Sequence, residues 1–150
     1  MAEDQLTQLG LEAQALAASL SAAGRRKLAA ELARTLRATQ AERIRANLQP
    51  DGTPMAPRKP RQAIKGRRGA LRRKMFGKLI SARWLKATAS PNEVSLAFVG
   101  SANRLATTHH FGLRERIKGQ TIQYPARELL GLAKGDLDRI EQAMLDHLTK

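Results

Sequence analysis

Apolar residues recur at multiples of four positions through residues 22–48, the most periodic segment of the chain. The repeating positions are Leu28, Leu32, Leu36, Ile44 and Leu48. Residues four apart share one face of an α-helix, so the pattern predicts an amphipathic helix about 40 Å long. Ser21 is suited to cap its N-terminus. A shorter and less regular pattern predicts a preceding helix over residues 4–20.

Proline and glycine interrupt the helical pattern after residue 48. The first cluster predicts a strong turn, because proline fixes φ and glycine accepts a positive φ; it comprises Pro50, Asp51, Gly52, Thr53 and Pro54. Two further prolines at 57 and 60 keep the following segment extended, and glycines at 66 and 69 loosen it. We therefore expect a long, mobile loop over residues 49–70 within a single domain, between a helical part (1–48) and an α+β part (71–150).

Two short helices are predicted beyond this loop. Residues 71–80 form the first, with Met75 and Leu79 facing inward. Residues 104–111 form the second, which stops at Gly112 because glycine readily adopts the left-handed conformation at a helix C-terminus.

Strand-like patterns appear twice in the same half of the chain. Residues 84–89 and 94–99 predict a hairpin with Pro91 in its turn, and residues 113–124 predict a loop or another hairpin. An amphipathic helix over 136–148 follows. The order predicts an α+β fold: long N-terminal helices and a C-terminal helix packed on a small antiparallel sheet, with a long basic loop.

The amino-acid composition indicates that the hydrophobic core of this fold is small. Hydrophobic residues make up 42% of the 150 residues, but many are alanines and aromatic residues are only 3%. Large side chains supply most of the burial energy of a core, so this core should be small. The long Ala- and Leu-rich helix should then complete its burial against a neighbouring subunit, which favours an oligomer.

The chain lacks cysteine, so it can form no disulfide and no thiolate site. Its first residues are acidic rather than basic, unlike a secretion signal. No apolar run approaches the roughly 20 residues that span a bilayer. We expect a soluble protein of a reducing cytoplasm that does not enter a membrane.

Charge points to acidic partners. Lys and Arg number 27 against 13 acidic residues, which gives a formal net charge of +14. Candidate partners are nucleic acid, an acidic protein surface, or acidic patches on other copies of the chain. No acidic residue lies between Gly52 and Asn92, where most of the basic residues belong to one segment: Arg58, Lys59, Arg61, Lys65, Arg67, Arg68, Arg72, Arg73 and Lys74.

This basic segment has three possible roles. It could become ordered against an acidic protein surface, contact nucleic-acid phosphates, or remain solvated. It carries no interleaved aromatic residue to stack on bases, and no helix-turn-helix, zinc or RNA-recognition signature accompanies it. Protein docking is therefore favoured, and nucleic-acid binding is the alternative.

Candidate catalytic residues are few. The imidazoles are His109, His110 and His147; an adjacent pair on a helix cannot point to one site, and no metal-ligand spacing accompanies them. Asp136 and Asp138 suit the positive dipole at the start of the terminal helix. No phosphate-binding glycine motif is present. We expect no enzymatic activity, no metal and no cofactor.

Several short motifs, in order from about residue 22 to the end, resemble one family: the virion morphogenesis (tail completion) proteins of temperate contractile-tailed phages. The matching pieces are residues 25–33, 50–58, 72–80, 110–113 and 124–127, with Leu130 and Gly131. The positions taken as structural motifs are Pro50, Asp51, Gly52, Pro54, His110, Gly112, Pro125 and Arg127. One departure is Met55, where the family often has an aromatic residue.

The resemblance implies a non-catalytic protein that finishes the tail so that it can join a DNA-filled head. It implies a homo-oligomeric ring, hexameric because the tail tube is six-fold, with the tail tube, tail terminator and neck or connector proteins as partners. Such a protein assembles in the host cytoplasm and ends in the virion at the head–tail junction. The alternative is a basic module that contacts the DNA end held in the neck. Residues 125–127 are expected to fix a turn that places the terminal helix against the sheet.

Overall fold

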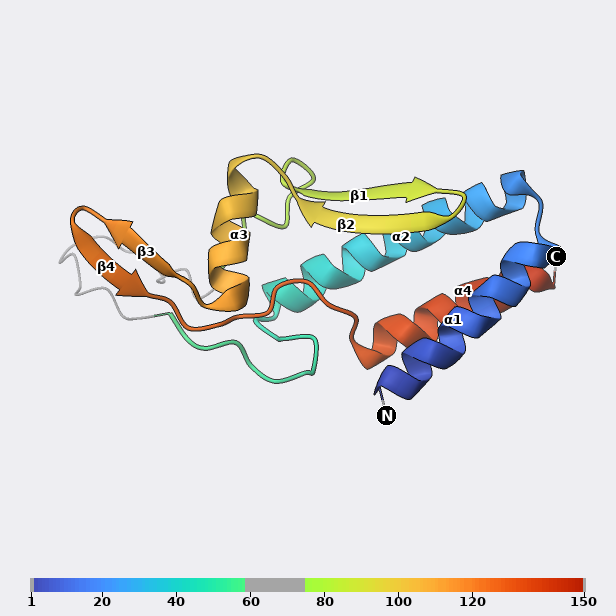
Figure 1. The fold of residues 1–150 in the computed structure, drawn as a ribbon, viewed down its shortest axis with the longest axis horizontal. Coiled ribbons are helices and arrows are strands. Elements are labelled where there is room, and N and C mark those ends of the chain that lie inside the picture. Colours follow the sequence, from blue (N-terminus) through green and yellow to red (C-terminus); the bar gives the residue numbers. More distant parts are fainter. Residues whose placement is uncertain (1, 59–74, 150) are drawn as a thin grey trace.

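A computed structural model describes residues 2–58 and 75–149 of the chain. The elements follow in the order α1 (Ala2–Ser19), α2 (Ala22–Arg45), β1 (Leu85–Ser90), β2 (Glu93–Phe98), α3 (Ser101–Phe111), β3 (Arg114–Ile117), β4 (Gln120–Gln123) and α4 (Lys134–Leu148). The predicted α+β class is confirmed, with two separate antiparallel hairpins, β1–β2 and β3–β4. The molecule is elongated, with α1 and α4 towards one end and β3–β4 at the other (Figure 1).

Helix α2 is the central element. Ser21 caps it as predicted, since its Oγ accepts a hydrogen bond of 3.1 Å from the backbone N–H of Gly24. The helix ends at Arg45 rather than at residue 48, because Asn47 takes a positive φ of 57°. Leu48 then pairs with Pro54 in an isolated antiparallel bridge.

The β1–β2 hairpin lies along α2, and its register runs from Leu85 opposite Phe98 to Ser90 opposite Glu93. Arg37 of α2 fixes the start of this hairpin. Its Nε donates to the carbonyl of Leu85 at 2.9 Å and its Nη2 to the carbonyl of Ile80 at 3.2 Å. A charged donor holds two backbone acceptors here, so the hairpin is anchored to the helix by polar as well as apolar contact.

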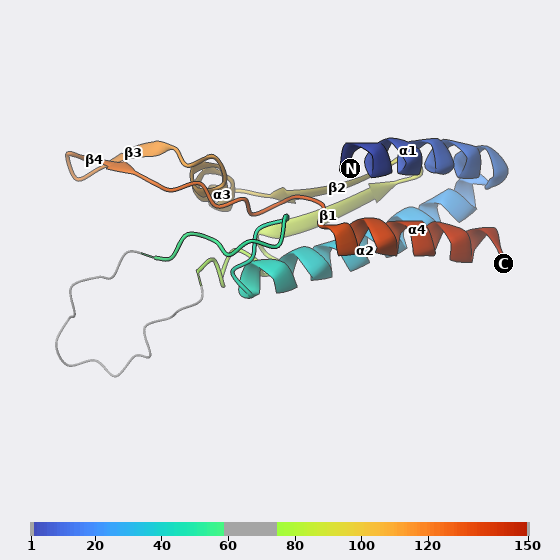
Figure 2. The same cartoon turned by 90° about the horizontal axis from the view of Figure 1, so that it is seen from below.

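Helices α1 and α4 lie side by side, and α4 also contacts α2 (Figures 1 and 2). The terminal helix packs on α1 and α2, not on the β1–β2 hairpin, so the expectation that a turn at 125–127 places it against the sheet is wrong. The reason is a small apolar cluster in which Met144 and Ile140 of α4 meet Leu28 of α2 and Leu9 of α1.

The predicted helix over 71–80 is also wrong where the structure describes it. Residues 75–80 form consecutive turns, and Phe76 has a positive φ of 63°, which a regular helix excludes. Met75 and Leu79 are nevertheless buried, as predicted. Helix α3 starts at Ser101, earlier than predicted, and ends at Gly112, whose φ of 65° and ψ of 51° are left-handed.

Most of the buried hydrophobic residues form one cluster, called the central core below. It comprises Ala41, Ile44, Met55, Met75, Leu79, Ile80, Leu85, Phe98, Ala102, Ala106 and Leu129. None of the described helices combines the length and the hydropathy that a membrane span requires.

Candidate functional site

The Pro50–Pro54 motif forms a tight turn directly after α2. The backbone N–H of Gln49 donates to the carbonyl of Thr53 at 2.8 Å, and Gly52 takes a φ of 85°. Asp51 Oδ1 accepts from the backbone N–H of Thr53 at 2.9 Å and from its hydroxyl, and these hydrogen bonds lower the pKa of the Asp51 carboxyl. Asp51, Gly52 and Thr53 therefore each contribute to the shape of the turn.

Arg127 ties this turn to the far end of the chain. Its side chain is buried, with 4% of the residue exposed. Nε donates to the carbonyl of Ala56 at 2.7 Å and Nη2 to the carbonyl of Pro57 at 3.0 Å. Burial, followed by the nearby charge of Arg58, lowers the pKa of the Arg127 guanidinium. A guanidinium suits this position because its planar fork can hold two carbonyls at once.

The histidine pair at the end of α3 completes this contact. The His109 ring lies between the rings of Phe76 and Tyr124, with centroids at 5.0 and 4.7 Å, and its Nδ1 is 3.3 Å from Arg127 Nη1. Because the guanidinium only donates, His109 Nδ1 acts as the acceptor. Burial, then the Arg127 charge, lowers the pKa of His109, while Glu115 acts in the opposite direction.

The His110 side chain contacts Leu129 rather than Arg127. Its Nδ1 accepts a hydrogen bond of 3.1 Å from the backbone N–H of Leu129. The adjacent imidazoles therefore hold two different parts of the 124–133 segment, and they do not converge on one site.

Two glycines allow close backbone approach at the same place. A Cβ on Gly112 would lie 2.7 Å from the backbone N of Ala126, and a Cβ on Gly131 would lie 2.6 Å from Pro50 Cγ. Both distances are shorter than a real Cβ tolerates. Gly112 is thus required where α3 meets the 125–127 segment, and Gly131 where that segment meets the proline turn.

Arg43 of α2 provides another polar clamp. Its Nη1 donates to the carbonyl of Leu48 at 2.9 Å, and its Nη2 donates to the carbonyl of Leu129 and to Gln40 Oε1, both at 2.6 Å. Burial lowers the pKa of Arg43, and the charges of Asp136 and Glu128 oppose this shift. Together with Arg127, Arg43 joins the proline turn, α3 and the 124–133 segment into what we call the arginine junction.

Asp136, at the start of α4, extends the same network. The residue is only 2% exposed. Its carboxylate accepts hydrogen bonds from Thr39 Oγ1 at 2.6 Å, Gln40 Nε2 at 3.0 Å and the backbone N–H of Ala133 at 3.0 Å. Asp136 therefore caps α4, as its position at the helix start suggested, and also connects α4 to α2.

Three of the sequence pieces that resembled one family, residues 50–58, 110–113 and 124–127, thus meet at the arginine junction, and comparison with known proteins identifies that family. The family model described as "Phage virion morphogenesis family" matches residues 4–149. The chain belongs to the phage virion morphogenesis family. It is similar to a protein named tail completion protein S from Escherichia phage P2, with 45% identity over 151 residues, which cover 99% of this chain and 95% of the relative. No solved structure matches the chain.

Within this family member, the predicted site residues fall into two groups. All eight structural-motif residues are described; Arg127 and His110 hold backbone groups, Gly112 permits a close approach, and Pro50 packs against Gly131. Of the basic segment only Arg58 is described, and it is exposed. The other members lie outside the described residues: Lys59, Arg61, Lys65, Arg67, Arg68, Arg72, Arg73 and Lys74.

Residues that the sequence analysis missed are Arg43, Gln40 and Thr39. One signal could have found Gln40: it occupies the position between Leu36 and Ile44 in the four-residue repeat, where an apolar residue would be expected. A glutamine buried on an apolar stripe needs polar partners, and here they are Asp136, Arg43 and the N–H of Gly131. Met55, the departure from the family's usual aromatic residue, is buried in the central core.

The buried polar side chains of the described residues make structural contacts. Across residues 2–58 and 75–149, no three His, Asp or Glu side chains come together in a way that could hold a metal ion. The buried polar groups of the arginine junction are directed at backbone carbonyls and at one another. What the arrangement does is position the proline turn, the start of the basic segment and the start of α4 relative to each other.

Proposed function

We propose that this protein is a structural tail completion protein that acts at the head-proximal end of a phage tail, finishes the tail and enables it to join a DNA-filled head. The observation that carries the proposal is the 45% identity to tail completion protein S of phage P2 over 99% of this chain. The buried arginines support a structural role, because their side chains hold backbone carbonyls of the proline turn and of the 124–133 segment.

The same proposal includes a ring, with six copies to match a six-fold tail tube. Large hydrophobic side chains remain exposed on the single chain, among them Leu6, Leu11, Phe111 and Leu148. Such side chains are commonly covered in an assembly, and closed point-group rings are usual for homo-oligomers. The protein would assemble in the host cytoplasm and remain in the virion at the head–tail junction.

The basic segment 58–74 would dock onto an acidic surface of the tail tube, the tail terminator or the neck. Arg58 supports this, because it is exposed and follows Pro57, whose carbonyl Arg127 holds. The arginine junction would thereby fix the point from which the segment leaves the folded body. The net charge of +14 also favours a second candidate, a contact with the DNA end in the neck.

Deletion of the coding sequence from the phage genome tests the function. Electron microscopy of the lysate should show DNA-filled heads and tails that remain unjoined, and a plasmid copy of the gene should restore virions. Normal virions without the protein would contradict the proposal.

Complementation with variants tests the basic segment. The quadruple variant R67A/R68A/R72A/R73A should fold, as judged by circular dichroism, but yield tails that fail to join heads. Replacement of Arg26, Arg34, Arg45 and Lys86 by alanine is the matched control and should still complement. DNA binding is separated by a filter-binding titration, in which affinity should depend on the same four arginines and persist at physiological salt.

A further inference from the structure

Acidic residues are concentrated on two helices of this basic protein. Helix α1 carries Glu3, Asp4 and Glu12 and no Lys or Arg. Helix α4 carries four acidic residues, Asp136, Asp138, Glu141 and Asp146, against Lys134 and Arg139. These two helices therefore hold seven of the 13 acidic residues of a chain whose net charge is +14.

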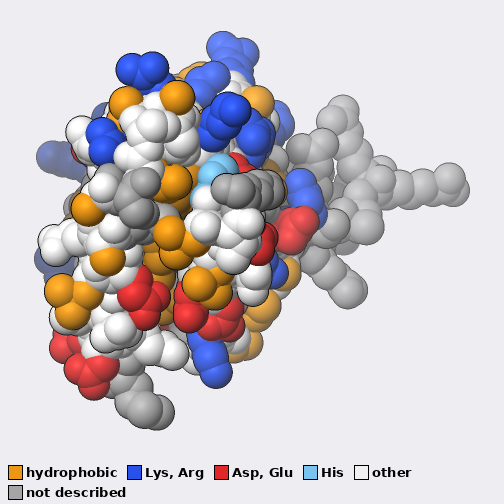
Figure 3. All heavy atoms as spheres, turned by 90° about the vertical axis from the view of Figure 1, so that its right-hand side faces the viewer, with side chains coloured by type: hydrophobic (Ala, Val, Ile, Leu, Met, Phe, Trp, Pro, Cys, Tyr) orange, Lys and Arg blue, Asp and Glu red, His pale blue; other side chains and the backbone are white. Residues whose placement is uncertain are grey.

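The same two helices leave an apolar surface uncovered. The exposed large hydrophobic residues there are Leu6, Leu11, Leu145 and Leu148, with exposed fractions of 48–58%. A shallow groove of about 250 Å³ runs between the helices and is lined by Glu12, Ala15, Glu141, Met144, Leu145 and Leu148. Figure 3 views this end of the molecule and shows Asp and Glu side chains gathered around exposed hydrophobic ones in its lower half. We call this surface the α1–α4 face.

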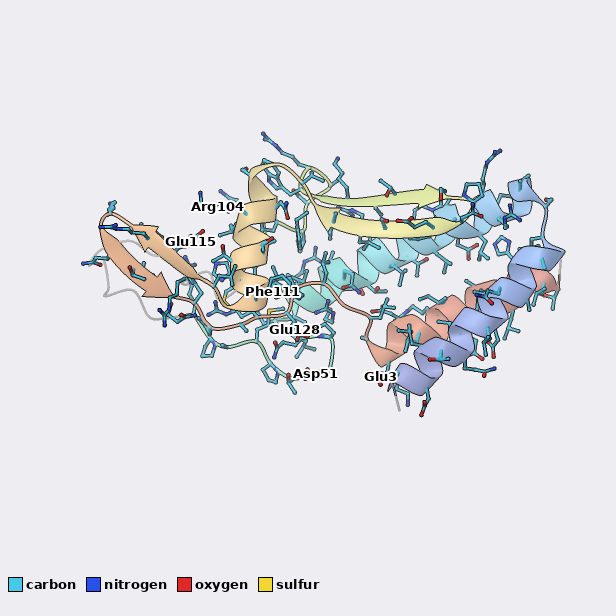
Figure 4. The ribbon with its side chains drawn as sticks, in the orientation of Figure 1. Glu3, Asp51, Arg104, Phe111, Glu115 and Glu128 are labelled. Atoms are coloured by element: carbon cyan, nitrogen blue, oxygen red, sulfur yellow. The ribbon has the colours of Figure 1, made fainter. Side chains whose placement is uncertain are left out.

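The opposite end of the molecule has the complementary character. Helix α3 and the β3–β4 hairpin carry Arg104, Arg114, Arg116 and Lys118, while Glu115 is the one acidic residue between Ser101 and Gln123. Glu115 is already engaged, since it accepts hydrogen bonds from Arg104 at 3.3 Å and from Thr108 at 3.1 Å (Figure 4). Exposed hydrophobic residues accompany these charges: Leu105, Phe111, Leu113 and Ile117. We call this surface the hairpin face.

We propose that the α1–α4 face of one copy docks onto the hairpin face of the next copy. This rests on the proposed ring and names its two surfaces. Each face combines exposed leucine or aromatic side chains with an excess of charges of one sign, negative on the α1–α4 face and positive on the hairpin face. Apolar burial supplies affinity and the charges set the orientation of the pair.

The positions of the two faces determine the type of assembly. They lie at opposite ends of an elongated molecule, so one copy cannot satisfy both of its faces by itself (Figure 1). Contact between two different surfaces is heterologous, and it propagates head to tail until the rotation between copies closes a ring. Pairing of two α1–α4 faces with each other is disfavoured, because it would bring acidic residues together.

Charge reversal on each face tests the proposal with the full-length protein. The acidic-face variant E12K/E141K and the hairpin variant R116E/K118E change exposed residues and should fold normally. Sedimentation velocity should show that each variant alone associates about tenfold or more weakly than the unchanged protein, since attractive pairs become repulsive.

Mixing the two charge-reversal variants tests whether the two faces bind each other. In an equimolar mixture, the reversed α1–α4 face of one variant meets the reversed hairpin face of the other, and the unchanged faces meet as before. The mixture should therefore recover the mass of the unchanged assembly, as should the quadruple variant that carries all four reversals. Matched controls are E42K/E93K and R34E/K86E, which change exposed charges by the same amount outside both faces and should leave the mass unaltered.

Several outcomes would overturn the proposal. A protein that stays monomeric at low salt at its highest soluble concentration has no such interface. Reversals that weaken association no more than the controls, or a mixture that stays dissociated, would also exclude pairing of these two faces. Weakening by the hairpin variant alone would show that the hairpin face contacts a different part of the neighbouring copy, and would also overturn the pairing. The deletion test of the function is independent, so unjoined heads and tails together with a failed mixing arm would reject only the interface.

Discussion

The two halves of α2 stand in contrasting environments. Its C-terminal half contributes Ala41 and Ile44 to the central core, which contains eleven buried hydrophobic residues. Its N-terminal half faces α1 and α4 in a cluster where only Leu28 and Met144 are buried. Polar clamps reinforce the first environment, with Arg37, Arg43 and Arg127 all bonded to backbone carbonyls. Stability is thus concentrated in the central core.

The contrast between the central core and the α1–α4 end indicates where a surface for assembly can form. Around the central core, apolar side chains are covered by the chain itself, and the buried arginines donate hydrogen bonds to backbone carbonyls. At the α1–α4 end, Leu6, Leu11, Leu145 and Leu148 stay exposed beside acidic residues. Exposed apolar surface of this kind is tolerated when a neighbour covers it. The region that contributes least to the fold of one copy is therefore the one suited to contact another.

Truncation of one residue in each half of α2 gives the largest expected difference. Ile44→Ala should lower the free energy of unfolding by about 4 kcal/mol, because Ile44 is fully buried in the central core and its cavity cannot collapse. Leu28→Ala should cost about 2 kcal/mol, since its thin surroundings can relax. Urea unfolding followed by circular dichroism measures both. Equal losses of unfolding free energy at the two positions would contradict the contrast between the two halves of α2.

Removal of a buried clamp comes next. Arg127→Ala should cost about 3 kcal/mol, because it leaves the carbonyls of Ala56 and Pro57 without their charged donor. Arg127→Lys should recover little of this, since an ammonium lacks the planar fork. Arg104→Ala serves as the control; its side chain is 84% exposed and its ion pair with Glu115 should contribute under about 0.5 kcal/mol. A comparable loss at Arg104 would show that burial is not the deciding factor.

Glycine-to-alanine changes should alter the free energy of unfolding in opposite directions in the two regions. Gly112→Ala should destabilise the protein by about 2 kcal/mol, because a left-handed φ of 65° is strained for alanine and its Cβ would meet Ala126. Gly10→Ala in α1 should stabilise it by about 0.5–1 kcal/mol, since apart from the adjacent residues and the helix's own backbone no atom lies within 4 Å of the new Cβ, and the site is helical. Thermal unfolding of the two variants would sharpen the comparison, and a stabilising Gly112→Ala would refute the geometry of the arginine junction.

The smallest effect expected is a pH dependence from the central region. The pKa of His109 in the folded protein is lowered from its ordinary value of 6.5, first by burial and then by Arg127. As the pH falls below this value, the unfolded chain binds the proton more readily, so the free energy of unfolding should fall. His109→Gln should show a flatter profile than the unchanged protein between about pH 7.5 and 5. Identical slopes for the two proteins would exclude His109 as the cause.

Local signals explain what sequence reasoning achieved for the fold. The four-residue repeat predicted α2, Ser21 predicted its cap, and Gly112 predicted the end of α3, because helix period and capping depend on near neighbours. The predicted helix over 71–80 failed at Phe76, which has a positive φ and whose ring packs against that of His109, far along the chain. A local pattern contains no information about such a contact.

The residues of the candidate site also divide into those that local sequence signals predicted and those that they did not. The proline turn and the glycines were found from their conformational preferences, and the family resemblance indicated Arg127. Arg43, Gln40 and Asp136 were not connected, because their partners are 86 to 97 positions away in sequence or lie on another element. A docking role for the basic segment remains a prediction.

Composition and periodicity alone determined the α+β class, the central amphipathic helix, the scarcity of large core residues and the excess of positive charge. Those properties are sums over residues or repeats between near neighbours, so they need no folded chain. Only the tertiary structure decided that α4 lies on α1 and α2, that three arginines hold backbone carbonyls, and that acidic and basic apolar faces sit at opposite ends. Each of these depends on which distant side chains meet, and burial and hydrogen-bond satisfaction are settled only when they do.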